Sequence, residues 1–167
     1  CPITDSPTRI LSAKTSTGIV LPNRLPRGMT VPGEPPRSML MREAISAKGA
    51  PAAVGNYSQA VKVGNMLYLS GQICLNAATG QFERDSVASQ TRRIMENLKA
   101  VVEGAGATMD DVVRCRAFLS DMKHFPEFDR VYGQYFTDPY PARMTVACAG
   151  IYDNLDVEMD MIVQLPS

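Results

Sequence analysis

The chain has 167 residues, of which 45% are hydrophobic, and its 17 basic and 17 acidic residues give a formal net charge of zero. This length suits about one globular domain with its own core, and the balanced charge lacks the basic surface by which proteins attract nucleic acid. No apolar run approaches the length of about 18 residues that spans a membrane.

The cysteine and histidine content argues against a metal centre. The four cysteines lie far apart in sequence, without Cys-x-x-Cys or Cys/His spacing, and His124 is the only histidine. We therefore expect no cofactor, and reduced thiols in a reducing compartment, with Cys115 and Cys148 acting as small apolar residues inside strands. His124 precedes an expected helix and is interpreted as a surface or capping residue.

The first 41 residues differ in composition from the rest. They hold seven of the twelve prolines and more basic than acidic residues, and they show no sustained periodicity. Three interpretations stay open: a transit-like presequence, which the lack of a clean amphipathic helix weakens, an expression remnant, or a native arm packed on the core or a neighbouring subunit. The predicted domain then covers residues 42–167. We expect a cytoplasmic protein, or a mitochondrial one if the extension is a targeting segment.

Extended structure begins the domain. A short extended piece is expected at residues 43–47. Strands at 60–63 and 66–70 follow, joined by Gly64-Asn65, an order that suits a type II′ hairpin turn. Gly71 comes directly after the second strand, where the lack of a side chain permits a backbone approach that a side chain would block.

A one-sided apolar stripe predicts a long first helix. Asp85 is a suitable N-cap, and Gly104 and Gly106 are expected to stop the helix. The stripe consists of Val87, Ile94, Leu98, Val101, Val102 and Ala105.

A second strand–helix pair follows. Residues 112–119 alternate apolar and polar side chains, which is typical of a half-buried strand. Pro126 suits the first turn of a second helix. The apolar face of that helix is expected to hold Phe128, Val131, Tyr132, Tyr135 and Phe136.

The segment 141–149 predicts the next strand, because Pro141 restricts the backbone and the residues behind it alternate. Arg143 stands at the start of this strand, on the same face as Thr145. Its planar guanidinium can hold a carboxylate through two parallel hydrogen bonds. A pairing with a protein carboxylate is the ordinary alternative.

The last strand is expected at residues 157–163, where Glu158 points away from Met159. The loop that connects it to the preceding strand is short. We therefore expect the two strands to pair as a hairpin, with Arg143 and Glu158 on one side of the sheet.

The element order is strand, strand, helix, strand, helix, strand, strand, after the short first extended piece. One sheet with two helices on one face is the natural α+β arrangement for this order. The open face of such a sheet needs cover, and a second copy of the chain is the simplest cover.

Several stretches, in this order and spacing, resemble the RidA/YjgF/UK114 family of reactive-intermediate deaminases, also called L-PSP endoribonucleases. The resemblance covers about residues 43–165. It is carried by Asn56-Tyr57-Ser58-Gln59-Ala60, Gly64-Asn65-Met66-Leu67-Tyr68, Ser70-Gly71-Gln72-Ile73, residues 90–101, Pro141-Ala142-Arg143 and Val157-Glu158-Met159-Asp160.

The resemblance implies a chorismate-mutase-like subunit with a single mixed sheet, assembled as a homotrimer with three clefts between subunits. It implies hydrolysis of 2-imino acids, such as 2-iminobutanoate and 2-iminopropanoate, to 2-keto acids and ammonia. It also implies that Arg143 binds the substrate carboxylate. The same cleft would be lined by Tyr57, Gly71, Ile73, Thr145 and Glu158.

Four departures from the family pattern stand out. Asn56 replaces the proline of Gly-Pro-Tyr, and Cys74 replaces the proline after Ile73. Asp129 replaces an asparagine of the second helix, at a position expected to bind substrate, and Ile151-Tyr152 replaces a Leu-Pro pair. The last two shape the family's pocket, so they bear on substrate preference more than on the reaction.

The residues themselves are compatible with imine hydrolysis. Orientation of the carboxylate by Arg143 can supply several kcal/mol, up to about 7–11 kcal/mol in the best intramolecular cases. Glu158 is the candidate to orient or deprotonate water, and beside a guanidinium it would be ionised. A structural ion pair between the two is the alternative. Tyr57 can donate a hydrogen bond or cover the ligand, and Thr145 can supply a hydroxyl.

Three functions stay open. The first is the imine deaminase. The second is a binding or chaperone-like trimer that holds small carboxylates without turnover. The third is an endoribonuclease or translation inhibitor, for which the chain offers neither a basic patch with interleaved aromatic residues nor a pair of histidines.

Overall fold

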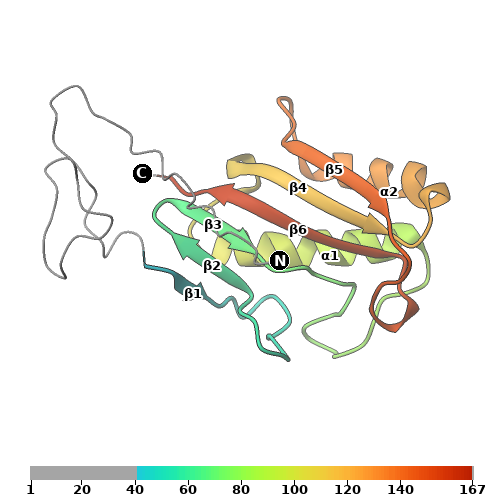
Figure 1. Ribbon diagram of the computed structural model, residues 1–167, viewed down its shortest axis with the longest axis horizontal. Coiled ribbons are helices and arrows are strands. Elements are labelled where there is room, and N and C mark those ends of the chain that lie inside the picture. Colours follow the sequence, from blue (N-terminus) through green and yellow to red (C-terminus); the bar gives the residue numbers. More distant parts are fainter. Residues whose placement is uncertain (1–40, 167) are drawn as a thin grey trace, which may run out of the picture. The chain divides into compact units, whose positions relative to one another are not determined.

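A computed structural model describes residues 41–166 of the chain. The three interpretations of the Pro-rich extension fall on residues 1–40, outside the described part, and stay predictions, as does the domain boundary. The described residues form a six-stranded sheet in the order β1-β2-β3-β6-β4-β5 (Figure 1). The strands are β1 Glu43–Ile45, β2 Ala60–Val63, β3 Met66–Leu69, β4 Val112–Leu119, β5 Ala142–Ala147 and β6 Val157–Gln164.

Two α-helices, α1 (Val87–Gly104) and α2 (Phe125–Tyr132), pack on one face of this sheet (Figure 1). β4 and β5 are parallel, and the other strand pairs are antiparallel. The predicted α+β fold, a single mixed sheet with two helices on one face, is confirmed. Among residues 41–166, none of the helices has the length and apolar character needed to cross a bilayer.

The predicted hairpin is confirmed. β2 and β3 pair with Val63 opposite Met66, so that Gly64 and Asn65 form a two-residue connection. Gly64 has a φ of 61°, as the first central position of a type II′ turn requires.

The helix termini differ from the prediction in detail. Ser86, not Asp85, caps α1, because its hydroxyl accepts the Ser89 amide while the Ser89 hydroxyl accepts the Ser86 amide, both at 3.0 Å. α1 ends at Gly104 as predicted. α2 ends at Tyr132, before the expected Tyr135 and Phe136, because a 3₁₀ turn starts at Gly133. The Phe136 ring still packs 4.8 Å from the Tyr132 ring.

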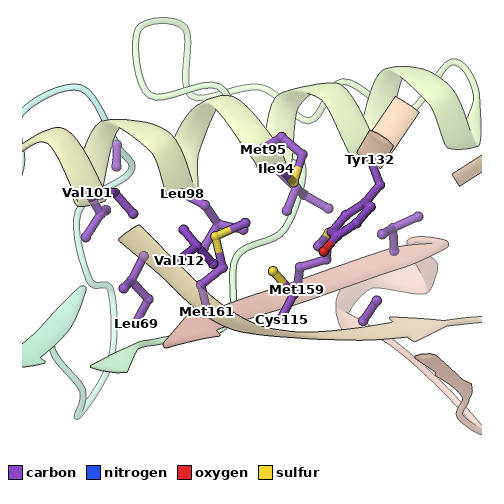
Figure 2. Close-up of a cluster of buried hydrophobic side chains, with 14 of the residues drawn as sticks. Leu69, Ile94, Met95, Leu98, Val101, Val112, Cys115, Tyr132, Met159 and Met161 are labelled. Carbon is purple, nitrogen blue, oxygen red and sulfur yellow. The ribbon is translucent and has the colours of Figure 1, made fainter. Parts of the chain in front are cut away.

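The core lies between α1, α2 and the covered face of the sheet (Figure 2). Ile94 and Leu98 of α1 are fully buried, as are Met159 of β6 and Cys115 of β4. Burial of each large apolar side chain contributes about 1.5–3 kcal/mol. The Cys115 thiol is free, and burial raises its pKa to about 11. Cys148 is also free, but it lies just beyond β5 rather than inside the strand.

The order of the last three strands contradicts the expected hairpin. β4 lies between β5 and β6, parallel to β5 and antiparallel to β6. The β4–α2–β5 segment is a strand–helix–strand crossover, which joins parallel neighbours. The short loop after β5 therefore passes beyond β4 to reach β6, and the two final strands never pair.

Candidate functional site

Arg143 and Glu158 lie on opposite faces of the sheet. In the strand register Arg143 is opposite Cys115, whereas Glu158 is opposite Phe118. Cys115 is fully buried under the helices, and Phe118, three residues along β4, points to the other face. Strand spacing and rise place the two Cα atoms roughly 14 Å apart. The expectation that the two side chains share a side of the sheet is wrong within one chain, and so is the alternative of an ion pair between them there.

Each of the two residues has a cavity of its own. The arginine cavity, of about 350 Å³, is lined by Asp129, Tyr132, Gly133, Tyr140, Pro141 and Arg143. The glutamate cavity, of about 610 Å³, is lined by Val54, Gly55, Tyr57, Ser70, Gly71, Ile73, Leu75, Phe82, Tyr152 and Glu158.

Helix α2 holds the Arg143 guanidinium. Its carbon Cζ lies 4.6 Å from the ring centroid of Tyr132, 5.4 Å from that of Phe125 and 5.5 Å from that of Phe128. Residues spaced by three and four share a face of a helix, so one aromatic face of α2 stacks on the arginine. This face was predicted only as core, and its role in holding Arg143 was missed.

Asp129, on the same helix, pairs with this guanidinium. Nη1 of Arg143 lies 2.7 Å from Oδ1 of Asp129. The structure therefore brings together two of the predicted site residues, in an ion pair within one chain. Thr145 lies two residues after Arg143 in β5, and its side chain is therefore on the same face of that strand. The Thr145 hydroxyl is buried and has no hydrogen-bond partner among residues 41–166.

The glutamate cavity contains three other predicted residues besides Glu158. Tyr57, Gly71 and Ile73 line it together with that carboxylate, so the structure brings these predicted residues together. The Glu158 side chain makes no hydrogen bond or ion pair with any residue in the range 41–166. Burial raises the pKa of Glu158 above its ordinary value, and the nearby Asp160 carboxylate adds to the effect.

The absence of a side chain at Gly71 leaves the space that the Glu158 carboxylate occupies. A β-carbon at Gly71 would overlap Oε1 of Glu158 and lie 3.2 Å from its Cδ. A close approach therefore occurs at Gly71 as expected, but the approaching group is the side chain of Glu158, the candidate base, and not another stretch of backbone.

A buried glutamine fixes the loop that carries Tyr57. Gln59 accepts the Ala47 amide at 2.6 Å and donates to the carbonyls of Ala47, Ala50 and Pro51 at 3.2, 3.2 and 2.6 Å. The Ser70 hydroxyl donates to the Ser58 carbonyl at 2.6 Å. These bonds tie both ends of the loop to the sheet, and the Tyr57 ring remains half exposed at the mouth of the cavity.

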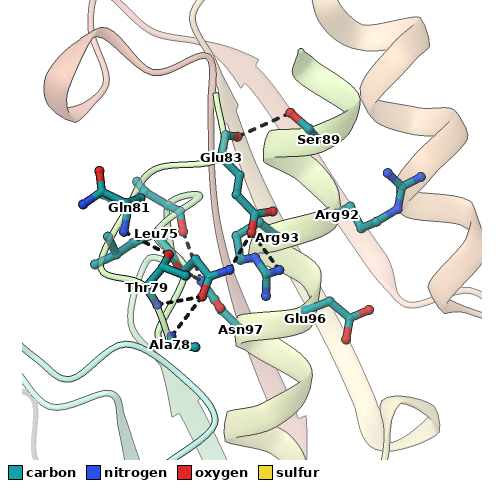
Figure 3. Close-up of polar contacts among 12 residues, drawn as sticks. Leu75, Ala78, Thr79, Gln81, Glu83, Ser89, Arg92, Arg93, Glu96 and Asn97 are labelled. Carbon is teal, nitrogen blue, oxygen red and sulfur yellow. Dashed lines mark hydrogen bonds and ion pairs between the residues drawn. The ribbon is translucent and has the colours of Figure 1, made fainter. Parts of the chain in front are cut away.

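The segment from Leu75 to Glu83 forms one wall of the cavity and is anchored on α1 (Figure 3). Asn97 donates to the carbonyl of Leu75 at 2.8 Å, and Arg93 pairs with Glu83 at 2.8 Å. The same Glu83 carboxylate accepts from Asn76 at 2.7 Å. These contacts hold Phe82 in the wall, a residue that the sequence analysis did not single out.

Tyr152 completes the wall from the loop before β6. Its ring lies 6.3 Å from the Phe82 ring, and Asp153 beside it pairs with Arg84, whose guanidinium stacks on Phe82. Asp153 and Asn154 have φ angles of 53° and 54°, so the loop makes a tight left-handed turn. One of the predicted departures from the family pattern thus lies directly in the cavity wall.

Within residues 41–166, no three His, Cys, Asp or Glu side chains gather in a group able to hold a metal ion. His124, expected to be a surface or capping residue, precedes α2 and lies 3.5 Å from an Asp156 oxygen. It lines neither cavity.

A sequence profile described as Endoribonuclease L-PSP matches residues 47–165. The chain belongs to this family, which is the RidA/YjgF/UK114 family. It is 41% identical over 125 residues to the 2-iminobutanoate/2-iminopropanoate deaminase of Dermatophagoides farinae, covering 75% of this chain and 98% of that protein.

A second relative of the same family is the Reactive Intermediate Deaminase A, chloroplastic, of Arabidopsis thaliana. It is 36% identical over 128 residues, which are 77% of this chain and 68% of that protein. The crystal structure of RidA from an Antarctic Psychrobacter species has a TM-score of 0.71 and 38% identity, covering 74% of this chain and 99% of that chain. The RidA-family fold is therefore shared along nearly the whole described domain.

Proposed function

We propose that this protein is a hydrolase that converts reactive 2-imino acids, such as 2-iminobutanoate and 2-iminopropanoate, to 2-keto acids and ammonia. The observation that carries the proposal is the Glu158 carboxylate. It lies unpaired among the described residues, in a cavity lined mainly by apolar side chains, and its pKa is raised. A carboxylate in that state is poorly suited to a structural role, and its raised pKa makes it a stronger base than an ordinary glutamate. The family membership supports the same reaction class.

The complete site needs two chains. Arg143 and Glu158 of one chain face opposite ways, and β5, which carries Arg143, is an edge strand. The uncovered face of the sheet exposes large apolar side chains at Tyr68 of β3 and at Met144 and Val146 of β5, and the Arg116–Asp160 ion pair lies on the strands between them. We infer that copies pack on this face as a homotrimer, so that the arginine cavity of one chain meets the glutamate cavity of the next.

The reaction then proceeds without a metal or cofactor. Arg143 binds the substrate carboxylate and presents the electrophilic imine carbon to a water held by Glu158. Glu158 takes a proton from the water as the water oxygen bonds to the imine carbon, the electron pair of the C=N double bond moves to nitrogen, and Glu158 delivers that proton to the nitrogen to give the carbinolamine. Glu158 then takes the proton of the carbinolamine hydroxyl and passes it to the nitrogen as the C–N bond breaks, which leaves the keto acid and ammonia. One water is consumed and one ammonia is released.

Four further residues predicted from the sequence have a part in this step. Tyr57, at the mouth of the glutamate cavity, donates a hydrogen bond to the substrate or covers it. The backbone around Gly71 and Ile73 lines the path of the water, and the unpaired Thr145 hydroxyl offers a further contact on the arginine side. Exclusion of bulk water by the apolar walls strengthens every polar contact inside.

Turnover tests the proposal directly. 2-Iminobutanoate is generated in situ by an amino-acid oxidase or a dehydratase, and its decay is followed with and without the protein. We expect the wild type to accelerate the decay, and Arg143→Ala to lose most of the acceleration. No acceleration by the wild type, or full acceleration by Arg143→Ala, refutes the deaminase. Binding of 2-keto acids without turnover would instead favour the binding or chaperone-like trimer.

A mixed assembly tests whether the site spans two chains. Arg143→Ala and Glu158→Gln chains, each inactive alone, are co-expressed with different tags and purified through both tags. In a ring of three, every mixed trimer contains one site with both wild-type residues, so about one third of wild-type activity returns. Mixed trimers without activity would place both residues in one chain's site and contradict the arrangement.

A further inference from the structure

Asp129 pairs with Arg143 without a well-aligned hydrogen bond. A distance of 2.7 Å separates Nη1 of Arg143 from Oδ1 of Asp129. The pair formed by Arg116 and Asp160 shows what a full fork looks like, since Nε and Nη2 of Arg116 donate to both carboxylate oxygens at 2.6–3.0 Å. A guanidinium has five N–H donors. Arg143 therefore keeps most of its donors free of hydrogen bonds to residues 41–166.

The arginine is the fixed member of this pair and the aspartate is the mobile one. The Arg143 side chain is 22% exposed and stacked against three rings of α2, whereas the Asp129 side chain is 47% exposed. Rotation of Asp129 about its own side-chain bonds moves its carboxylate into solvent without disturbing α2. Rotation of Arg143 would break three stacking contacts.

A second carboxylate that approaches this guanidinium meets the charge of Asp129. Two carboxylates about 5 Å apart weaken binding by about 4-fold at the dielectric constant of water and by well over 100-fold at the effective value of about 20 near a protein surface. Because the Asp129 side chain is half exposed, solvent screening places the expected effect toward the lower end, at about 10-fold. A substrate carboxylate that forms two parallel hydrogen bonds with the guanidinium gains more than the poorly aligned contact of Asp129 provides. An anion that forms only one contact with Arg143 gains no advantage over Asp129.

We propose that Asp129 is a specificity-determining residue that competes with the substrate carboxylate for Arg143 and rotates away when a 2-imino acid binds. The proposal rests on the proposed function in one respect, that Arg143 is the carboxylate anchor. Asp129 keeps the guanidinium occupied in the empty site. It thereby selects planar anions that bind with two oxygens, and it weakens the hold on the 2-keto acid product.

The test compares binding of 2-ketobutanoate, a stable product, by isothermal titration calorimetry. We expect Asp129→Asn to bind it about 10-fold more tightly than the wild type. Asp85→Asn is the matched control, because it removes an exposed carboxylate outside both cavities, and its affinity should be unchanged. The neutral analogue 2-oxobutanamide should gain no affinity from Asp129→Asn. In turnover, Asp129→Asn should lower KM by a similar factor with kcat within about twofold.

Equal or weaker binding of 2-ketobutanoate by Asp129→Asn, with an unchanged melting temperature, would overturn the proposal, since Asp129 would then support the ligand. Asp129→Ala, a second neutral variant, should shift affinity in the same direction if the asparagine variant folds poorly. A wild type that binds the keto acid but hydrolyses no imine refutes the deaminase and leaves this comparison valid. Absence of binding in both wild type and Asp129→Asn refutes the competition itself.

Discussion

Replacement of Gly71 by alanine tests how strongly activity depends on the position of the Glu158 carboxylate. The new β-carbon would overlap Oε1 of Glu158, so that oxygen must move by more than about 1 Å to reach van der Waals separation. Only a flexible side chain stands in the way. The backbone of Gly71 does not have a positive φ, so alanine is compatible there and gains about 0.4–1 kcal/mol through the unfolded state. Rotation of Glu158 costs about 0.5–1.5 kcal/mol.

The net effect of Gly71→Ala on stability is therefore expected within about 1 kcal/mol of zero. A displacement of about 1 Å in a catalytic group can cost about 100-fold in rate, and we expect a loss of that order in kcat for 2-iminobutanoate. Gly150→Ala is the control, because a β-carbon there meets nothing within 4 Å. The loss should disappear in a Glu158→Ala background, where nothing remains to be displaced. Full activity of Gly71→Ala, or an equal loss in that background, would refute the reasoning.

Three further changes test other contacts. Burial raises the pKa of Glu158 in the folded protein above its value in the unfolded chain. The folded protein therefore keeps the carboxyl proton to a higher pH, and the free energy of unfolding falls as the pH rises from the unfolded pKa through the folded pKa. Glu158→Gln should therefore raise the melting temperature more at pH 8 than at pH 4, and an equal shift at both would contradict this. Gln59→Leu leaves the buried Ala47 amide and the loop carbonyls unpaired, at about 1–3 kcal/mol for each group, so urea unfolding should show a loss above about 2 kcal/mol. Cys148 is partly exposed, whereas Cys115 is buried and has a pKa of about 11, so Cys148 should be alkylated first. Mass spectrometry after timed alkylation measures the order, and earlier modification of Cys115 would contradict the prediction.

The local elements were predictable because their signals are local. The alternation of apolar and polar side chains over residues 112–119 predicted both ends of β4. The Gly64-Asn65 pair between two apolar runs predicted the turn of the β2–β3 hairpin. The N-cap of α1 was missed by one residue. Asp85 and Ser86 are both good capping residues, and only the reciprocal contact of Ser86 with Ser89 decides between them.

The position of β4 in the sheet was missed because it depends on contacts far apart in sequence. A short loop between β5 and β6 favoured a hairpin, and that inference placed Arg143 beside Glu158. The sequence held a contrary signal, the strand–helix–strand order of β4, α2 and β5, which favours a parallel crossover and an edge position for β5. The members of the glutamate cavity were easier to predict, since the family motifs supply Tyr57 and Gly71. Phe82 carries no such motif.

The separation of Arg143 from Glu158 within one chain has a chemical consequence for the proposed two-chain site. An arginine held permanently beside Glu158 would lower the pKa of that carboxylate and make it a weaker base. In the proposed arrangement the guanidinium reaches Glu158 only across the subunit boundary, and it carries a carboxylate when it does so, from Asp129 in the empty site or from the substrate in the loaded one. The positive charge is compensated in both states. Burial can therefore keep the pKa of Glu158 raised while a cation stands a short distance away, and the same Asp129 that competes with the substrate preserves the base that acts on it.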